Sequence, residues 1–414
     1  MTDYNRLVEL VRENSPFYRE LYQDLPDAPA LEELPVVDHG AYWAANTLHD
    51  NRLHTAKHVG GIVFKSGGTT SAPKVSVYTR AEWREMSETF SKGLAAAGLR
   101  EGDRVANLFY AGELYSSFIF TLNALQDSPV DTVQLPIAGS STQEFITNTL
   151  LEFGGTVLAA PPTSLCQLAQ YVHDTVGSLP LIRLVLFSGE AFYGDQRELL
   201  ASAFPNASVR SIGYASVDGG ILGSPVDGEE DARVHQVYPG RIMEILDEDT
   251  GAPITEPGRV GRIVVTDLVR TLQPVLRYPV GDRAEWVDVD ARTFRLLGRS
   301  DEGARVGPVT LYLDDLLSIV KTAVGGQGIT GGQVVLRRRA AKDQLVLRLA
   351  GDVVGTDKLT EAIAARLDET RPMFADHVAR GLIQPLAVEW VGTTELTTNP
   401  RTGKLVRLID ERGA

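Results

Sequence analysis

The sequence is poor in cysteine: its 414 residues contain only one, Cys166. A single cysteine excludes an intramolecular disulfide and any zinc site built from several thiolates. Basic residues are also scarce, with 40 Lys and Arg against 54 Asp and Glu. The resulting net charge of −14 disfavours a general nucleic-acid binder, which normally carries a basic stripe. The densest basic run, Arg337–Arg339, is short and is interpreted as a solvated strand end.

Long apolar runs are missing as well. None approaches the roughly 20 residues that a helix needs to span a bilayer, and the N-terminal MTDYNRLVELVREN lacks the apolar core of a signal peptide. We therefore expect a cytoplasmic protein with no membrane association. Hydrophobic residues make up 43% and charged residues 23%, which is ordinary for a globular protein long enough for two or three domains.

Between residues 60 and 213, short apolar runs alternate with helical patterns. This alternation is typical of βαβ units and predicts a parallel sheet. The expected strands are Gly61–Phe64, Val105–Phe109, Val157–Ala160, Leu184–Phe187 and Val209–Ile212. The expected helices are Arg80–Ala97, Tyr115–Leu125, Thr142–Phe153, Ser164–Val176 and Asp195–Phe204. Ligands of such sheets bind beyond the carboxyl ends of the strands, so the loops there are where a site should be sought.

The pattern changes after about residue 235. Short strands separated by Asp, Gly and Pro turns indicate a β-rich subdomain. These strands are Gly240–Asp247, Gly261–Thr266, Arg283–Val289 and Thr293–Gly298. Further strands near Gln333–Arg338, Gln344–Leu349 and Ala387–Val391 and a helix near Thr356–Glu369 follow. We predict an α/β protein with a large N-terminal domain of several subdomains over residues 1–298, which combines βαβ sheets and the β-rich subdomain. A small, mobile α+β C-terminal domain is predicted over residues 299–414.

The most informative segment is the run from Ser66 to Lys74, SGGTTSAPK, which directly follows an apolar strand. Glycines let the backbone approach a phosphate closely, and consecutive amide groups form an anion-binding concavity. Thr69 and Thr70 add hydroxyl donors, and Lys74 adds a positive charge. The run lacks the G-x-x-x-x-G-K-[ST] pattern of a Walker A loop. Taken alone, it is more readily interpreted as a surface loop rich in small residues.

This run resembles the phosphate-binding motif of the acyl-adenylate-forming superfamily, which includes acyl-CoA synthetases, peptide-synthetase adenylation domains and luciferases. Five further segments resemble motifs of that superfamily in the same order. They are Ser188–Glu190, Gly213–Asp218, Tyr278–Asp282, Leu297–Asp301 and Pro400–Lys404. Each match is weak alone, but all of them in order form a specific signature. Within the superfamily the chain is similar to the phenylacetate–CoA ligase branch. The segment Asn14–Tyr22 resembles the opening segment of that branch.

The resemblance implies that the chain binds ATP. The residues that would hold its β- and γ-phosphates are Ser66, Gly67, Gly68, Thr69, Thr70 and Lys74. The residues that would contact the adenine are Ser188, Gly189 and Glu190. Tyr214 would stack on the adenine, Asp282 would accept the ribose hydroxyls, and Arg299 would approach the ribose or phosphate from the hinge. A core tyrosine, a turn aspartate and a surface Gly-Arg turn are the competing interpretations.

The implied catalytic residues are Lys404, Thr70 and Asp218. Lys404 would reach the substrate when the C-terminal domain moves, although an exposed terminal lysine is the competing interpretation. Asp218 stands where the family uses glutamate to hold Mg²⁺, and a carboxylate is the right hard ligand for that ion. The sequence departs from the family pattern here, because Asp is one methylene shorter and Val217 replaces a hydroxyl residue. Ser71 stands where the family normally has glycine.

The implied reaction activates a small carboxylic acid as acyl-AMP, with ATP and Mg²⁺, and releases pyrophosphate. Transfer to a thiol such as coenzyme A would follow, but Arg305–Tyr312 departs from the family's thiol-channel segment. Coenzyme A, a stand-alone carrier protein, an amine or no acceptor therefore stay open. The aromatic segments Asn107–Glu113 and Tyr115–Phe120 favour an aromatic acid, or are ordinary core. Relatives in this branch are often homodimers, but the sequence itself does not specify the oligomeric state.

Two other functions stay open. The first is a ligase-like protein that binds nucleotide or acyl-AMP with little turnover, which the departures at Asp218 and Val217 motivate. The second is an unrelated α/β nucleotide-binding enzyme, such as a kinase, with chance motif matches.

Overall fold

The structure is a computed structural model that describes residues 3–65, 74–112, 114–189, 194–216, 218–229, 231–299, 303–325, 329–351, 353–392, 395–397, 406 and 408–413. Several of the predicted site residues lie outside the described residues. They are Ser66, Gly67, Gly68, Thr69, Thr70, Glu190 and Lys404. The backbone of Arg299 is described, but its side chain is not.

The predicted parallel sheet is present, with five strands in the order β4-β3-β5-β6-β7 among the described residues. The strands are β3 (Arg104–Asn107), β4 (Val133–Leu135), β5 (Val157–Ala160), β6 (Leu184–Phe187) and β7 (Ser208–Ser211). The helices beside it are α4 (Arg80–Ala96), α5 (Ser117–Gln126), α6 (Gln143–Phe153), α7 (Pro162–Thr175) and α8 (Gly194–Ala203). Strands β5 and β6 are buried throughout, as expected for parallel strands with both faces covered.

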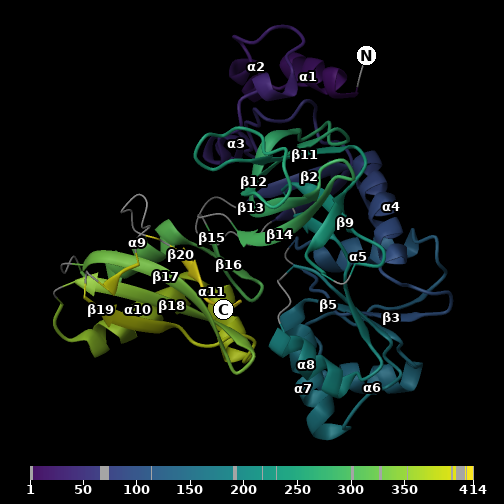
Figure 1. Ribbon diagram of the computed structural model, residues 1–414, viewed down its shortest axis with the longest axis vertical. Helices are drawn as coiled ribbons and strands as arrows, with labels where there is room; N and C mark the ends of the chain where they lie inside the picture. The colour runs from purple at the N-terminus through teal and green to yellow at the C-terminus, as the bar shows by residue number, and fades with distance from the viewer. Residues whose placement is uncertain are drawn as a thin grey trace.

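The side chains of β5 and β6 alternate between two cores. Val157 and Leu186 join the core that includes Phe90 of α4 and Leu125 of α5. The side chains between them, such as Leu158, join a second core with residues of α6, α7 and α8. This period of two follows from strand geometry, and it places helices on both faces of the sheet. Figure 1 shows this layered region with α6, α7 and α8 on its outer side.

The expectation that Gly61–Phe64 joins the parallel sheet is wrong. This segment is a strand, β1 (Gly61–Lys65), but it pairs antiparallel with β2 (Val75–Thr79), which the sequence analysis did not predict. Lys65 and Val75 form the last pair of this hairpin. Residues 66–74 are too short for the crossover connection that a parallel neighbour requires, so they connect the strands of a hairpin. The predicted phosphate-binding run therefore follows a hairpin strand, not a strand of the parallel sheet.

The predicted β-rich subdomain is an antiparallel sheet in the order β11-β12-β13-β14-β10-β9-β8. Its strands are β8 (Tyr214–Ser216), β9 (Gly220–Pro225), β10 (Val234–Val237), β11 (Arg241–Leu246), β12 (Val260–Asp267), β13 (Val275–Asp288) and β14 (Thr293–Arg299). The N-terminal segment forms α1 (Asp3–Asn14), α2 (Pro16–Leu21), the 3-10 helix η1 (Leu31–Glu33) and α3 (His39–Ala45). It packs Val11, Tyr18 and Tyr42 onto Ile263 and Leu276 of the sheet (Figure 1).

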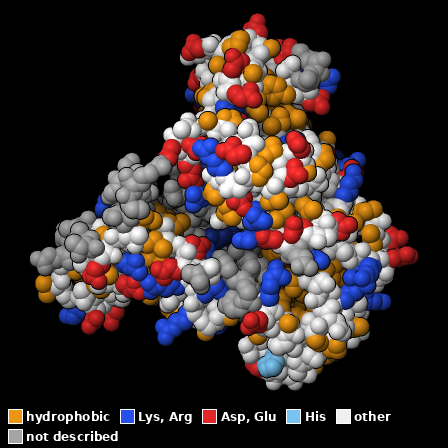
Figure 2. Space-filling model, viewed as in Figure 1, with side chains coloured by type: hydrophobic (Ala, Val, Ile, Leu, Met, Phe, Trp, Pro, Cys, Tyr) orange, Lys and Arg blue, Asp and Glu red, His pale blue; other side chains and the backbone are white. Residues whose placement is uncertain are grey.

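The C-terminal part has its own sheet, in the order β19-β18-β17-β20. Its elements are β15 (Gly303–Val306), β16 (Val309–Tyr312), α9 (Leu313–Ala323), β17 (Ile329–Arg339), β18 (Lys342–Gly351), α10 (Thr356–Thr370), α11 (Pro372–Ala379), β19 (Ala387–Val391) and β20 (Leu408–Asp410). Its buried core draws on residues 304–383 alone, which agrees with a separate folding unit. Figure 1 shows it beside the rest of the molecule, and Figure 2 shows the surface hollowed between the two. The boundary at residue 298 stays a prediction.

Among the described helices, none combines the length and the apolar character that crossing a bilayer requires.

Glu82 joins the start of α4 to the chain that leads into β13. Its carboxylate accepts the backbone N–H groups of Thr79 at 2.7 Å, Thr271 at 2.7 Å and Leu272 at 2.9 Å. Burial alone would raise the pKa of Glu82, but these backbone hydrogen bonds outweigh it and lower the pKa below its usual value. The carboxylate thus links the β-rich subdomain to the helix that covers the parallel sheet.

We predict that Glu82→Gln lowers the free energy of unfolding by about 2–4 kcal/mol, because the buried N–H group of Leu272 and two partly buried N–H groups lose a charged acceptor. The measurement is urea unfolding of wild type and variant at pH 7. The folded-state pKa of Glu82 is depressed, so its contribution is present above the unfolded-state pKa and lost as the pH falls through the folded-state pKa. Glu88→Gln, at an exposed position of the same helix, is the matched control. Equal stability of the two variants would contradict this account.

Candidate active site

Two predicted motifs meet at the carboxyl ends of β6 and β7. Ser188 follows β6, and its hydroxyl donates a hydrogen bond to the carbonyl oxygen of Gly213 at 3.4 Å. Gly213 lies beyond β7 with a φ of +123°, and a Cβ there would lie 2.9 Å from the carbonyl oxygen of Gly223. Only glycine fits this position without strain. The predicted adenine-contacting turn is therefore a neighbour of Gly213, the first residue of the predicted motif Gly213–Asp218.

Tyr214 and Asp282 lie in contact. The Tyr214 hydroxyl donates to Oδ2 of Asp282 at 2.6 Å, and its ring lies against Phe294, with ring centres 6.0 Å apart. Tyr214 is on β8, at one edge of the antiparallel sheet, whereas Asp282 is on β13. The sheet must curl for these two strands to meet. The residues predicted to bind adenine and ribose thus lie side by side, with Tyr214 half-buried.

Asp218 occupies the turn between β8 and β9. Its Oδ2 accepts a hydrogen bond from the Tyr278 hydroxyl at 2.9 Å, and the same hydroxyl accepts one from Nε1 of Trp43 at 2.9 Å. Burial raises the pKa of Tyr278 well above its ordinary value, and the neighbouring Asp218 carboxylate adds to the shift. The Tyr278 hydroxyl therefore keeps its proton and donates a hydrogen bond to Asp218. The chain Trp43–Tyr278–Asp218 fixes the orientation of the carboxylate.

Arg270 supports the same turn from beneath. Its Nη1 donates to the backbone carbonyl oxygen of Asp218 at 2.5 Å, and its guanidinium lies 4.4 Å from the centre of the Tyr78 ring. The side chain is fully buried, and its Nε and Nη2 have no hydrogen-bond partner among the described residues. Burial alone would lower the pKa of Arg270, but the neighbouring Tyr78, Tyr42 and Asp267 outweigh it and raise the pKa above its usual value. Nothing in the sequence pattern distinguishes this arginine from the basic residues around it.

Lys74 contacts the N-terminal helix α3. Its Nζ lies 2.8 Å from Nε2 of His39 and 5.7 Å from the centre of the Trp43 ring. His39 in turn lies against Tyr278, with ring centres 5.7 Å apart. The two α3 residues are four apart and therefore share one helix face. The sequence analysis missed both His39 and Trp43, although the helical spacing after Asp38, whose side chain caps α3, was the available signal.

The strand that carries Arg299 of the predicted motif Leu297–Asp301 lies beside Asp282, the residue predicted to bind the ribose. In the register of β13 and β14, the Cα atom of Arg299 pairs with that of Asp282. The described residues thus bring Lys74, Ser188, Gly189, Tyr214, Asp218 and Asp282 to the junction of the parallel sheet, the curled antiparallel sheet and α3. Figure 2 shows Lys and Arg side chains along the hollow that faces the C-terminal part, which suits an anionic ligand.

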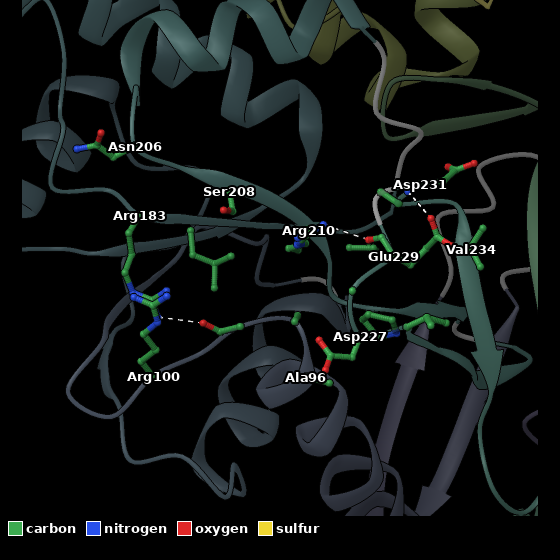
Figure 3. Close-up of a pocket in the computed structure, with 18 residues that line it drawn as sticks. Ala96, Arg100, Arg183, Asn206, Ser208, Arg210, Asp227, Glu229, Asp231 and Val234 are labelled. Carbon is green, nitrogen blue, oxygen red and sulfur yellow. Dashed lines mark hydrogen bonds between the residues drawn. The ribbon is translucent and has the colours of Figure 1, made fainter.

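A separate cavity of about 340 Å³ lies at the amino end of β6 and along β7 (Figure 3). It contains none of the predicted site residues. Several charged residues that line it have partners: Arg183 forms an ion pair with Asp103, Asp231 forms one with Arg295, and Arg210 donates to the backbone carbonyl oxygen of Glu229 at 3.1 Å. We interpret this cavity as part of the seam between the two sheets.

No protein-family model matches the sequence. Phenylacetate–coenzyme A ligase of Thermus thermophilus is 25% identical over 98% of this chain and 94% of its own length. The enzyme of that name from Pseudomonas putida is 24% identical over 74% of this chain and 68% of its own length.

A solved structure of 2-hydroxyisobutyryl-CoA ligase with 2-HIB-AMP and CoA in the thioesterification state covers 99% of this chain and 88% of its own, with a TM-score of 0.72 and 19% identity. The same ligase has a TM-score of 0.61 in the postadenylation state with 2-HIB-AMP, at 17% identity, and 0.60 in an open conformation, at 19% identity. Both cover 99% of this chain, and 88% and 90% of their own. The chain is therefore similar over nearly its whole length to a phenylacetate–coenzyme A ligase in sequence, and to 2-hydroxyisobutyryl-CoA ligase in fold.

Proposed function

We propose that this protein is an AMP-forming acid–thiol ligase, which activates a small carboxylic acid as acyl-AMP and transfers the acyl group to coenzyme A. The observation that carries the proposal is the meeting of Tyr214, Asp282 and Asp218 next to Lys74, at the end of the phosphate-binding run. A half-buried aromatic ring beside a carboxylate provides a stacking surface and a diol acceptor for adenosine. Lys74 lies on the side where the phosphates would extend.

The first step needs charge neutralisation but no general base. The substrate carboxylate is ionised at pH 7, because its reference pKa is about 4. It must approach the α-phosphate of a polyanion, so cationic and amide donors have to offset the charge that develops. Lys74, held by His39, and the predicted Lys404 would supply the cations. The attacking carboxylate oxygen bonds to the α-phosphorus, and pyrophosphate leaves with the electrons of the broken P–O bond.

Asp218 fits a role as the protein ligand of Mg²⁺. Groups of three or more His, Cys, Asp or Glu side chains that could hold a metal by themselves are absent from the described residues. Mg²⁺ is commonly held by one or two carboxylates, with substrate phosphates and water as the other ligands. The Tyr278 hydrogen bond to Asp218 orients the carboxylate. When bound, Mg²⁺ would neutralise phosphate charge.

The acid is proposed to be aromatic. Tyr110 follows β3, next to β5 in the parallel sheet, and lies half-buried at the carboxyl end where the other site residues gather. Its hydroxyl lies 3.2 Å from Oγ of Ser164, which orients the ring. Buried Phe109 precedes it. These rings support an apolar pocket for an aryl or arylacetic acid, and phenylacetate is the acid that the names of the curated relatives specify.

We expect exchange of radiolabelled pyrophosphate into ATP that depends on an added carboxylic acid. Benzoic, phenylacetic and hydroxybenzoic acids form the test panel, with short aliphatic acids for comparison. Exchange strongest with an aromatic acid supports the proposal. A protein that binds ATP but shows no exchange with any acid would instead support the ligase-like binder with little turnover.

Lys404→Ala is expected to lower the exchange rate by orders of magnitude while ATP binding survives, because the lysine would offset charge only in the transition state. Exchange assays and calorimetric titration with ATP measure the two effects. Lys358→Ala, at an exposed position of α10, is the matched control. Exchange at the wild-type rate in Lys404→Ala would remove this lysine from the mechanism.

Tyr278→Phe is expected to raise the Mg²⁺ concentration for half-maximal exchange about tenfold, because the Asp218 carboxylate loses its orienting donor. Tyr4→Phe, which removes a hydroxyl bonded to the carbonyl oxygen of Pro29, is the control. An unchanged Mg²⁺ requirement in Tyr278→Phe would argue against Asp218 as the metal ligand.

A further inference from the structure

The C-terminal part contacts the rest of the protein through Arg380, which directly follows α11. Its guanidinium carbon lies 5.7 Å from the centre of the Tyr110 ring, and its carbonyl oxygen accepts a hydrogen bond from Nε2 of Gln167 at 3.1 Å. One residue thus touches both the loop after β3 and helix α7. The contact joins segments more than 200 residues apart in the chain.

Local structure prepares Arg380 for this contact. Gly381 takes a φ of +66° and ends α11, which leaves the carbonyl group of Arg380 free of the helix ladder and turned to Gln167. Asp376, one helical turn earlier, lies 3.5 Å from Nη1 of Arg380 and orients the guanidinium. A planar cation of this kind stacks well on an aromatic ring. These features lie within the C-terminal part itself, so they do not depend on contact with the rest of the chain.

A second close approach of the C-terminal part lies nearby. Nη2 of Arg305, on β15, lies 3.5 Å from where a side chain at Gly189 would begin. Gly189 belongs to the turn predicted to contact adenine, and its φ of +87° also favours glycine. The C-terminal part therefore faces both the nucleotide turn and the proposed acyl pocket.

The TM-scores against 2-hydroxyisobutyryl-CoA ligase differ among the three states in which that ligase has been solved. Its postadenylation, open and thioesterification structures each match nearly all of this chain, yet the thioesterification structure gives the highest TM-score of the three. Of these three structures, the thioesterification structure is therefore the one that this chain as a whole resembles most.

We propose that Arg380 is a positioning residue for thioester formation: its contacts with Tyr110 and Gln167 hold the C-terminal part in the thiol-transfer arrangement. This inference rests on the proposed function. In that step the thiol sulfur bonds to the acyl carbon, the bond from that carbon to the AMP oxygen breaks, AMP leaves with the electron pair, and the thiol proton passes to solvent. Two partly exposed contacts are weak enough to open again, which adenylation in the next cycle requires.

The two half-reactions separate this role from a structural one. Adenylation is measured by pyrophosphate exchange, and thioester formation by mixing preformed acyl-AMP with coenzyme A in a single turnover. Arg380→Ala should slow thioester formation about tenfold and leave exchange within about twofold of wild type. Arg380→Lys keeps the charge but loses the planar stack, so it should recover only part of the rate. Arg366→Ala, which loses an exposed ion pair within α10, is the matched control.

Equal losses in both half-reactions, or no loss in thioester formation, would overturn the proposal. Absence of exchange in the wild type with every acid would instead count against the proposed function. Thermal unfolding of each variant identifies any that fail to fold.

A crosslink tests the docking contact without turnover. In the double variant Gln167→Cys/Arg380→Cys, a short bis-maleimide should join the two new thiols, while the native Cys166 is buried. The crosslinked protein should still form thioester from acyl-AMP but should lose exchange. A crosslink yield no higher than that of Gln167→Cys/Arg366→Cys, or full exchange after crosslinking, would contradict the proposal.

Discussion

Two hydrogen bonds from tyrosine hydroxyls to aspartates hold the site together. Tyr214 donates to Asp282, and Tyr278 donates to Asp218, so each bond joins the β8–β9 hairpin to β13. These strands are distant in the order of the antiparallel sheet, and the bonds form only because the sheet curls. The curl brings the adenosine candidates and the metal candidate to the carboxyl ends of the parallel strands. Without it, the motifs would lie on separate surfaces.

The buried charges around these bonds make the arrangement rigid. Arg270 holds the carbonyl oxygen of Asp218, and Glu82 holds the chain that follows Arg270. Buried groups of this kind are costly to leave unpaired, so they select one arrangement of the turn over its alternatives. On the other side, α3 supplies Trp43 and His39, which link Tyr278 to Lys74. The N-terminal segment is therefore part of the site as well as part of the core.

Local pattern predicted much of the fold. Runs such as Val157–Ala160 and Leu184–Phe187 became buried parallel strands, because a continuous apolar run suits a strand covered on both faces. The placement of Gly61–Phe64 was wrong, because an apolar run shows that a strand is present but not which strand it pairs with. Strand β2 was overlooked, although Val75–Thr79 has the alternating pattern of a strand.

The site was predicted in part. The motifs identified Tyr214, Asp218 and Asp282, and the structure places them together. The two hydrogen bonds that join them, Tyr214 to Asp282 and Tyr278 to Asp218, depend on the curl of the sheet. His39, Trp43 and Arg270 act through tertiary contacts that no short motif records. The roles of Ser66–Thr70, Glu190 and Lys404 stay predictions, since these residues lie outside the described part of the chain. Arg380 illustrates the same point at a larger scale, because its partners are known only once the two parts of the chain are placed.

The central claim is that the nucleotide binds where the curled sheet meets the parallel sheet. A crystal structure with a non-hydrolysable acyl-AMP analogue tests it most directly. The account predicts the adenine on the ring of Tyr214, with the ribose hydroxyls on Asp282. A nucleotide lodged elsewhere, for example in the cavity beside β7, with Tyr214 still bonded to Asp282, would contradict it.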